Sequence, residues 1–356
     1  DNCYDCRFIF DCRNCKHCYC CFNLRNADYH IFNKPVSPKE FQALRKTIDG
    51  FRNKTAETAA VFAKYVRGNA VHRWMVGRLH DNASGNYIEN SRNIHRSFFI
   101  GDGEDLIHTV RSYKGQKNSM DIFGVSAGEL IYNSSNLDFS FNCACCFGGE
   151  HNNDCAYCME CFHCADCFGC IGLRHKQHYI FNKQYAPDAY RVLRRQIAAE
   201  MLARGEWGEF FPPEASPYLY NETAAHEYYP LAEEQARCRG FGWQSPDARD
   251  YSEQTCELPD SIADAGDKLC SAVMRCTSCT RNYRLALAEL SFYRRMTIPV
   301  PEHCPECRHA ARMKLLNPVL VWERCCANCA SPIVSSYAPS RPERVFCEQC
   351  YLNHLG

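Results

Sequence analysis

The 356-residue sequence lacks a run of apolar residues long enough to cross a membrane, so we expect no membrane partner. It also lacks an excess of charge of one sign, because 41 Lys and Arg residues balance 41 Asp and Glu residues. The net charge therefore indicates no particular partner. It contains no phosphate-binding loop, nucleophile elbow or H-E-x-x-H motif, so we expect no enzyme, no catalytic residue and no small-molecule substrate.

Cysteine is the residue that the sequence has in excess, with 28 copies in two classes. Sixteen lie densely packed in residues 3–21 and 143–170, and the other twelve follow residue 237. Small secreted domains use many cysteines as disulfide frameworks because their cores are too small to be stable alone. This chain is 46% hydrophobic and long enough for roughly two or three domains, so it does not need such bridges. We expect free thiols and a reducing, cytoplasmic location.

The segment CAYCMECFHCADCFGC, residues 155–170, places a cysteine at every third position. This period fits neither the alternation of a strand nor the 3.6 residues of a helix turn. We interpret the run as small side chains that point inward and stack between successive turns of a narrow β-solenoid core. An iron–sulfur or other metal site and a set of disulfides stay open as alternatives. The regular two-residue spacing, without a following Pro, differs from the ferredoxin pattern.

The sequence contains an internal duplication. Residues 20–48 align without gaps on residues 169–197, at an offset of 149. Identical positions in the two copies include Cys21/Cys170, Leu24/Leu173, Arg25/Arg174, Ile31/Ile180, Phe32/Phe181, Asn33/Asn182, Lys34/Lys183, Pro38/Pro187 and Leu44/Leu193. One module is therefore used twice, and we expect the first copy to be truncated at residue 1.

Local patterns predict where helices and strands lie. Ser37, Pro38 and Glu40 form a capping-box pattern that begins a helix over residues 37–48, and Pro187 begins its counterpart. Residues 54–80 predict a longer helix, rich in Ala. Between residues 85 and 172, Asn, Ser, Gly and Asp interrupt every apolar stretch, which indicates short strands. Residues 200–269 are rich in aromatic residues and Pro, and we expect them to pack as a strap against the solenoid.

These patterns, together with four C-x-x-C pairs in the last 81 residues, a spacing typical of zinc sites, predict the fold class. It is a mainly β fold with helical connections, in which cysteine-lined β-solenoid repeats precede tandem four-cysteine zinc ribbons. The expected domains are the end of a truncated first repeat (1–36), a helical connection (37–84), a second solenoid repeat (85–185), a helix with the aromatic strap (186–269) and a zinc-ribbon module (270–356).

The last 81 residues carry four C-x-x-C pairs, at 276–279, 304–307, 326–329 and 347–350. Two such pairs on separate turns complete a tetrahedral thiolate site, as structural zinc requires. We predict two structural Zn²⁺ ions. The expected ligands are Cys276, Cys279, Cys304 and Cys307 for the first ion, and Cys326, Cys329, Cys347 and Cys350 for the second. A cross-braced arrangement, in which pairs alternate between the metals, stays open.

The same module carries most of the positive charge. Residues 271–356 contain 11 Lys and Arg residues against 6 Asp and Glu residues. Aromatic residues lie near these cations, a combination that suits phosphate contact with base stacking. The candidate nucleic-acid contacts are Arg294, Arg295, Arg308, Arg312, Lys314 and Arg324. An alternative with equal weight is an ordinary solvated surface, on which these arginines pair with Glu302, Glu306 and Glu323.

Four segments carry a resemblance to a known group: CFGCIGLRHKQHYIFNKQYAPDAY, GEFFPPEASPYLYNETAAHEYYPL, LSFYRRMTIPVPEHCPECRHAARMKLLNP and SYAPSRPERVFCEQCY. They resemble an uncharacterised family of cysteine-rich proteins with treble-clef zinc ribbons and β-solenoid repeats, encoded by small-genome uncultured bacteria. The resemblance implies architecture without an activity, and it implies that residue 1 lies inside a larger protein. Relatives carry Cys before the IFNK motif, whereas this chain has His30 and Tyr179.

We therefore expect a non-catalytic zinc-binding scaffold whose zinc-ribbon end binds nucleic acid, foremost RNA, or a ribonucleoprotein assembly. Two alternatives remain. In the first, the solenoid and ribbons bind other proteins or further copies of this chain. In the second, the cysteine runs serve a metal-handling or redox protein. Salt-dependent affinity for RNA separates the main hypothesis from the first alternative.

Overall fold

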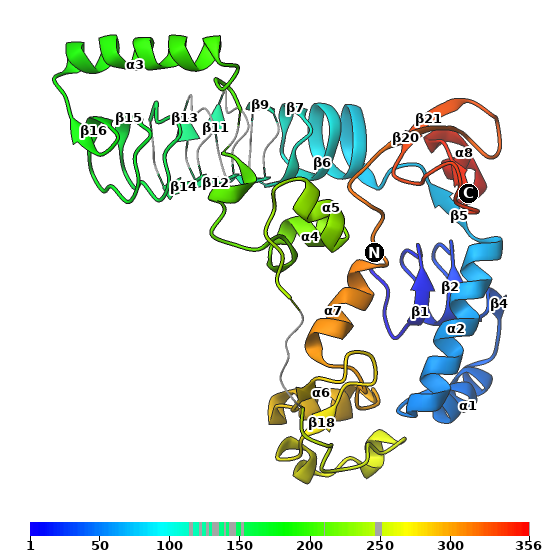
Figure 1. Cartoon of the computed structure of the whole chain (residues 1–356). Helices are drawn as coiled ribbons and strands as arrows, with labels where there is room; N and C mark the ends of the chain where they lie inside the picture. Colours follow the sequence, from blue (N-terminus) through cyan, green and yellow to red (C-terminus); the bar gives the residue numbers. More distant parts are fainter. Residues whose placement is uncertain are drawn as a thin grey trace.

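The computed structural model describes residues 1–113, 117–120, 123–125, 128–129, 135–138, 140–141, 147–150, 153–209, 211–245 and 251–355. Three cysteines of the dense class, Cys143, Cys145 and Cys146, lie outside these residues. Within them the chain forms several small sheets and eight α-helices. Figure 1 shows a row of short strands beneath helix α3, and a second group of strands beside helices α1 and α2.

The first stack, residues 4–35, consists of short parallel strands that lie side by side. Its strands are β1 (Arg7–Phe10), β2 (Lys16–Phe22), β3 (Asp28–Ile31) and β4 (Lys34–Pro35). Arg7 pairs with Tyr19, and Lys16 pairs with Asp28. Each pairing joins residues twelve apart, so twelve residues make one rung. The antiparallel hairpin of β3 and β4 ends the stack.

The second stack comprises the described residues between 77 and 184. Its strands are β6 (Gly77–Gly101), β7 (Glu104–Ile107), β8 (Val110–Tyr113), β9 (Lys117–Met120), β10 (Phe123–Val125), β11 (Gly128–Glu129), β12 (Ser135–Asp138), β13 (Ser140–Phe141), β14 (Phe147–Glu150), β15 (Ala165–Phe168), β16 (Gln177–Ile180) and β17 (Lys183–Gln184). The offset of twelve recurs where β6 pairs with β7 and β15 pairs with β16. The 25 residues of β6 therefore span two rungs.

The backbone of both stacks turns at every third residue. From Asn2 to Phe32, every third residue has a positive φ near 50°, and the same holds from Tyr87 to Arg111. Four such corners divide a rung of twelve residues. Asn, Asp and His tolerate this left-handed conformation better than other residues that carry a Cβ, which explains why they recur in these segments. Asn90, Asn93, Asp102 and Asp105, which interrupt the apolar stretches, are therefore corners of the rungs.

The residue after each corner points into the stack, and in the cysteine runs this residue is cysteine at every position except Ile9. The six cysteines of residues 155–170 have exposed fractions of 0–2% and pack together in one cluster. The Cys15 thiol lies 3.3 Å from the carbonyl oxygen of Arg13 and 3.5 Å from that of Leu24, so it can donate to carbonyls of its own and the next rung. Burial raises the pKa of Cys12 to about 12, which keeps its thiol neutral. This burial fits the core-ladder interpretation.

The period of three also runs through a segment without cysteine, where we had not identified it. The inward residues there are Ile88, Ser91, Ile94, Ser97, Ile100, Leu106, Thr109 and Ser112, all buried. Two of the hydroxyl groups bond the backbone of the next rung: Ser91 Oγ accepts from the Gly103 N–H at 2.9 Å, and Ser97 Oγ accepts from the Thr109 N–H at 3.0 Å. Gly85 faces Ser97, and a Cβ at Gly85 would lie 1.7 Å from the Ser97 carbonyl oxygen. Glycine is therefore required at this inward position, although Ile and Leu fit at others.

An asparagine closes each copy of the duplicated module. The Asn33 side chain accepts from the Phe22 N–H and donates to the Phe22 carbonyl, both at 2.9 Å. Asn182 makes the same two bonds to Ile171, also at 2.9 Å. The amide thus satisfies the backbone groups that another rung would otherwise pair with. This role explains why both copies carry the IFNK motif.

Helices α1 (Pro38–Ile48) and α3 (Pro187–Ala203) follow the two caps. The capping box predicted for α1 is present, because Ser37 Oγ accepts from the Glu40 N–H at 3.3 Å and Glu40 accepts from the Ser37 N–H. The helix predicted over 54–80 ends much earlier, since α2 covers Arg52–Asn69. Residues after Ala70 instead form strand β5 (Val71–Arg73), whose backbone pairs with the C-terminal module.

Two aromatic residues of the strap contact the second stack. Trp207 lies parallel to Phe168 with ring centroids 6.2 Å apart, and Tyr228 lies 6.0 Å from Phe99. The strap holds the short helices α4 (Ala224–Tyr228) and α5 (Glu233–Cys238), and four 3₁₀ turns lie at Pro213–Ala215, Tyr220–Glu222, Ile262–Asp264 and Asp267–Cys270.

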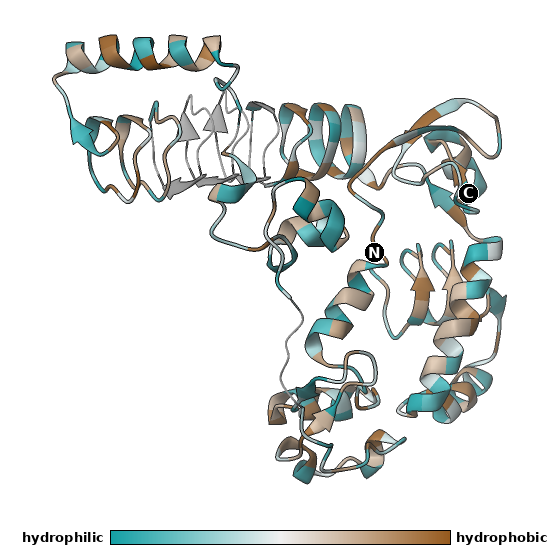
Figure 2. Cartoon of the chain, viewed as in Figure 1, coloured by the Kyte–Doolittle hydropathy of each residue, from teal (hydrophilic) through white to brown (hydrophobic). Residues whose placement is uncertain are grey.

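Polar and apolar residues are interspersed along α3 (Figure 2). Among the described residues, none of the helices combines the length and the apolar character that crossing a membrane requires.

The burial of the cysteine ladder predicts its reactivity. In native protein, iodoacetamide should modify the exposed Cys238 and Cys325 and leave the cysteines of 155–170 unmodified, because these six thiols are buried and the reagent cannot reach them. Mass spectrometry of tryptic peptides, with and without denaturant, measures this directly. Modification of most of these six thiols without denaturant would instead favour the redox or metal-handling interpretation.

Candidate metal centres

The C-terminal cysteine pairs lie on two small modules of the same design. The first contains β18 (Met274–Arg275), β19 (Asn282–Tyr283), α6 (Leu287–Met296) and α7 (Pro305–Met313), and the second contains β20 (Trp322–Cys325), β21 (Pro332–Ser335), β22 (Arg344–Phe346) and α8 (Glu348–Leu355). In each module the first cysteine pair lies on the turn of a two-stranded antiparallel hairpin. The second pair lies at the N-terminus of α7 in the first module and of α8 in the second.

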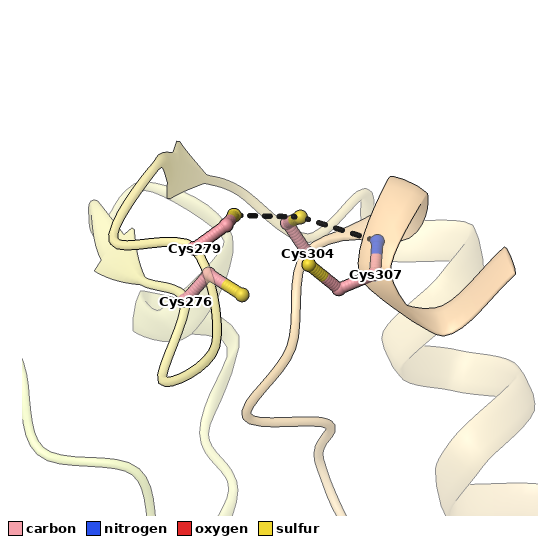
Figure 3. A group of neighbouring side chains, drawn as sticks. All are labelled: Cys276, Cys279, Cys304 and Cys307. Atoms are coloured by element: carbon pink, nitrogen blue, oxygen red, sulfur yellow. Dashed lines mark hydrogen bonds between the residues drawn. The ribbon is translucent and has the colours of Figure 1, made fainter. Parts of the chain in front are cut away.

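In the first module, Cys276, Cys279, Cys304 and Cys307 come together with their sulfur atoms all within 4.8 Å of one another. Figure 3 shows the hairpin pair and the helix pair facing each other, with the Sγ atoms of Cys279 and Cys304 3.6 Å apart. Cys304 is the N-cap of α7 and its sulfur accepts from the Cys307 N–H at 3.5 Å. The helix N-terminus thus favours negative charge on these sulfurs.

The second module repeats this arrangement with Cys326, Cys329, Cys347 and Cys350. The Sγ atoms of Cys329 and Cys347 lie 3.8 Å apart. The Cys326 sulfur accepts from the Cys347 N–H at 3.2 Å. The cysteine pairs therefore group in chain order in both modules, and the cross-braced arrangement is not the one that the structure contains.

The turns of the two hairpins also share a backbone conformation. The residue after each first pair, Thr280 or Ala330, has a positive φ near 60°. Its N–H donates to the carbonyl of the first cysteine at 3.0 Å in both modules. This tight turn points both sulfurs of the pair to the same side, where one ion can contact them together.

The sulfur geometry matches a tetrahedral metal site and excludes a disulfide. A disulfide holds its sulfurs about 2.05 Å apart, far less than the 3.6 and 3.8 Å found here. A zinc ion with Zn–S bonds of about 2.3 Å places its four sulfurs about 3.8 Å apart. Each group offers four thiolates, so the two groups can hold two metal ions.

Local hydrogen bonds favour the thiolate form that a metal needs. Burial by itself would raise the pKa of Cys276, but backbone N–H groups around its sulfur outweigh this effect and lower the pKa to about 6. The Ser331 hydroxyl lies 3.2 Å from the Cys329 sulfur, and this hydrogen bond lowers the pKa of Cys329 to about 6. These two thiols therefore release their protons near neutral pH, whereas burial raises the pKa of Cys304 and Cys307.

The six cations predicted to contact nucleic acid have different environments. Arg294 pairs with Asp267 at 2.7 Å and Arg308 pairs with Glu289 at 2.8 Å. Arg324 donates to main-chain carbonyls, including that of Tyr337 at 3.3 Å. These three are therefore engaged in holding the modules together, although not through the acidic residues proposed in the solvated-surface alternative.

The other three predicted cations are exposed. Arg295 packs over the ring of Phe292, with its guanidinium 5.7 Å from the ring centroid. Arg312 and Lys314 line a cleft of about 1000 Å³ between α4 and α7. Neither Arg312 nor Lys314 forms an ion pair with another described residue. These three side chains are the ones that remain available to a phosphate group.

Sequence reasoning did not identify several residues that support the second site. Asn328 donates from its side chain to the Cys350 sulfur at 3.3 Å. Strand β5, which we had expected to be helical, pairs in parallel with β22 immediately before Cys347. Asn328 and Ser331 lie next to the cysteines, but no sequence pattern distinguishes them from other polar residues. The pairing of β5 joins segments more than 270 residues apart, which no local pattern reports.

Metal content tests the two centres. We expect two zinc ions for each purified chain after gel filtration, and about one after Cys276→Ser or Cys347→Ser, because three thiolates hold zinc less tightly than four. Cys325→Ser is the matched control, since Cys325 is adjacent to Cys326 but exposed and outside both groups. Elemental analysis gives the result, and iron or less than one zinc in the unmodified chain would contradict the assignment.

Comparison with protein-family models, with curated proteins and with solved structures gave no match to this chain. The assignment of the two metal centres therefore depends on their own geometry and chemistry.

Proposed function

We propose that this chain is a non-catalytic scaffold held together by two structural zinc ions. The observation that carries the proposal is that each centre offers four cysteine sulfurs as ligands. A tetrahedral site filled by four thiolates leaves no position for water or substrate, so its metal stabilises a fold instead of activating a nucleophile. Free thiols throughout the described residues support a reducing, cytoplasmic location.

The position of the second centre supports a role at the joint between the two stacks. Strand β22 pairs with β5, which lies between the stacks, and Arg73 pairs with Glu348 at 2.7 Å. On the side of the first stack, the Tyr351 hydroxyl contacts both Asp11 and Arg25.

On the side of the second stack, Asn86 donates to Ser336 Oγ at 3.0 Å. A metal that orders this module thereby fixes contacts to both stacks.

We further propose that the two stacks are β-solenoids and that the C-terminal modules are treble-clef zinc ribbons. The recurring offset of twelve residues between parallel strands supports the first statement. The placement of one cysteine pair on a hairpin turn and the other at a helix N-terminus supports the second. In this arrangement the solenoids provide long surfaces and the ribbons hold them in place.

Nucleic-acid binding at the ribbon end, foremost of RNA or a ribonucleoprotein, is the second candidate. It is favoured by Arg295, Arg312 and Lys314, which are exposed on α6 and immediately after or within α7. Arg295 lies over Phe292, so a cation and an exposed aromatic face occur together there. Such a surface would bind phosphate groups with little preference for base sequence.

The scaffold proposal predicts how loss of the second metal acts at a distance. Cys347→Ser should accelerate hydrogen exchange at the amides of Val71–Arg73 by about tenfold or more, because β22 no longer holds this strand. Exchange at residues 155–170 should not change, since these rungs lie far from the module in the chain and pack among themselves. Mass-spectrometric hydrogen exchange measures both, with Cys325→Ser as control. Unchanged exchange at β5 would argue against the proposed role at the joint.

The nucleic-acid candidate predicts a salt-dependent affinity. The triple variant Arg295→Glu, Arg312→Glu and Lys314→Glu should lose RNA binding and its salt dependence, because three phosphate contacts become repulsive. Arg294→Gln is the control, since Arg294 is already paired with Asp267 and should affect RNA binding little. Fluorescence anisotropy with a labelled single-stranded RNA at several salt concentrations measures the affinity and its salt dependence. If the unmodified chain binds neither RNA nor DNA at low salt, this candidate fails.

A further inference from the structure

The end of the second stack carries an exposed apolar surface next to α3. Ile171 is 60% exposed and Phe181 is 65% exposed, although both are large and apolar. They border a groove of about 490 Å³, whose other lining residues include Met159, Gly169, Ile197 and Met201. Large apolar side chains gathered around a groove indicate a binding surface more often than isolated ones do.

The duplicated module shows what covers the equivalent surface in the first copy. At the offset of 149, Ile171 corresponds to Phe22 and Phe181 corresponds to Phe32. Phe22 is only 9% exposed, because Tyr65 of α2 lies over it with ring centroids 5.0 Å apart. The Tyr65 ring also lies 5.3 Å from that of Phe32, and its hydroxyl donates to the Phe32 carbonyl at 3.2 Å. A helix therefore occupies this face in the first copy.

The second copy does not form a helix at this position. In the first copy α1 ends at Ile48, and Gly50, with φ of +83°, lets the chain reverse into α2. In the second copy Ala198 and Ala199 stand where Asp49 and Gly50 would be, and α3 continues to Ala203. Helix α3 therefore continues beyond the position at which the first copy reverses direction and begins its second helix.

The strap covers only part of the face that α2 covers. Trp207 lies over Tyr157 with ring centroids 5.9 Å apart, and Tyr157 is the counterpart of Phe8. In the first copy, Phe8 is covered by Phe62 of α2, at 6.3 Å. Trp207 therefore takes the place of Phe62. No described residue takes the place of Tyr65, which leaves Ile171 and Phe181 exposed.

We propose that this groove binds an amphipathic α-helix of a partner protein, in the place that α2 occupies in the first copy. The partner helix presents an aromatic side chain, as Tyr65 does, over Ile171 and Phe181, with a hydroxyl that reaches the Phe181 carbonyl. A second copy of this chain is not the occupant, because its own α2 is held by aromatic contacts in its first stack.

The charge at the rim suits a basic helix. Glu200, Arg204 and Glu206 line the groove, which gives one net negative charge. Helix α2 carries Arg52, Lys54, Lys64 and Arg67 against Glu57, a net charge of +3. A peptide with the sequence of α2 is therefore a suitable probe for the groove. The proposal rests on the scaffold function, but the site is remote in sequence from the cysteines of both metal centres.

The experiment titrates a fluorescein-labelled peptide of residues 52–69 with the complete 356-residue chain and follows fluorescence anisotropy. Saturable binding is expected, and Phe181→Glu or Ile171→Glu in the chain should weaken it by about tenfold or more, because a carboxylate would then have to be buried in an apolar contact. The peptide variant Tyr65→Ala should be weakened similarly. Leu315→Glu is the matched control, since Leu315 is 84% exposed outside the groove and should leave binding unchanged.

Each outcome has a distinct meaning. Absence of saturable binding, or equal binding by Phe181→Glu and the unmodified chain, overturns the proposal. Light scattering on the same samples tests whether a second copy of this chain occupies the groove. A dimer that Phe181→Glu abolishes would identify a second copy as the occupant and would also overturn the proposal of a partner helix. Zinc content of each sample, measured in parallel, reports on the scaffold function. Two zinc ions without peptide binding would refute only the groove. An unchanged unfolding transition in Phe181→Glu shows that the variant is folded.

Discussion

The structure depends on a backbone constraint, the left-handed turn at every third residue of the two stacks. Four such turns in twelve residues give a rung so narrow that only certain side chains fit inside it. Cysteine fits because its thiol is small and can donate to carbonyls of its own and the next rung. Serine fits for the same reasons, glycine fits because it has no side chain, and Ile or Leu alternate with them where the volume allows. The composition of the chain follows from this geometry.

This geometry also leaves groups at the ends and faces of each stack that other parts of the chain must cover. A stack of parallel rungs exposes unpaired backbone groups at its ends and apolar corner residues along its faces. The side-chain amides of Asn33 and Asn182 satisfy the end groups, while helices and the aromatic strap cover the faces. The four-cysteine modules add stability that a small fold of about 40 residues does not obtain from its own core. The pairing of β5 with β22 connects parts of the chain that are far apart in sequence.

Several features could be predicted because they depend on neighbours in sequence. The capping box at Ser37, the C-x-x-C pairs and the inward cysteines at every third position all follow from local spacing. Features that depend on distant partners could not be predicted. The helix expected to reach residue 80 ends at Asn69, because Val71 and its neighbours pair with β22 instead. Arg294 and Arg308 looked available in sequence, yet each has an acidic partner that only folding brings near.

The sequence by itself determined the duplication, the eight metal-ligand candidates and the period of three in the cysteine runs, since each is a repeated spacing along the chain. Only the tertiary structure decided which cysteine pairs share a site, because the spacing also allowed a cross-braced arrangement. It likewise revealed that the two copies of the module differ in their surroundings. Phe22 and Ile171 occupy equivalent places in equivalent rungs, but one lies beneath a helix and the other does not. The physical reason is the few residues after Ile48 and Ile197, which reverse the chain in one copy and extend a helix in the other.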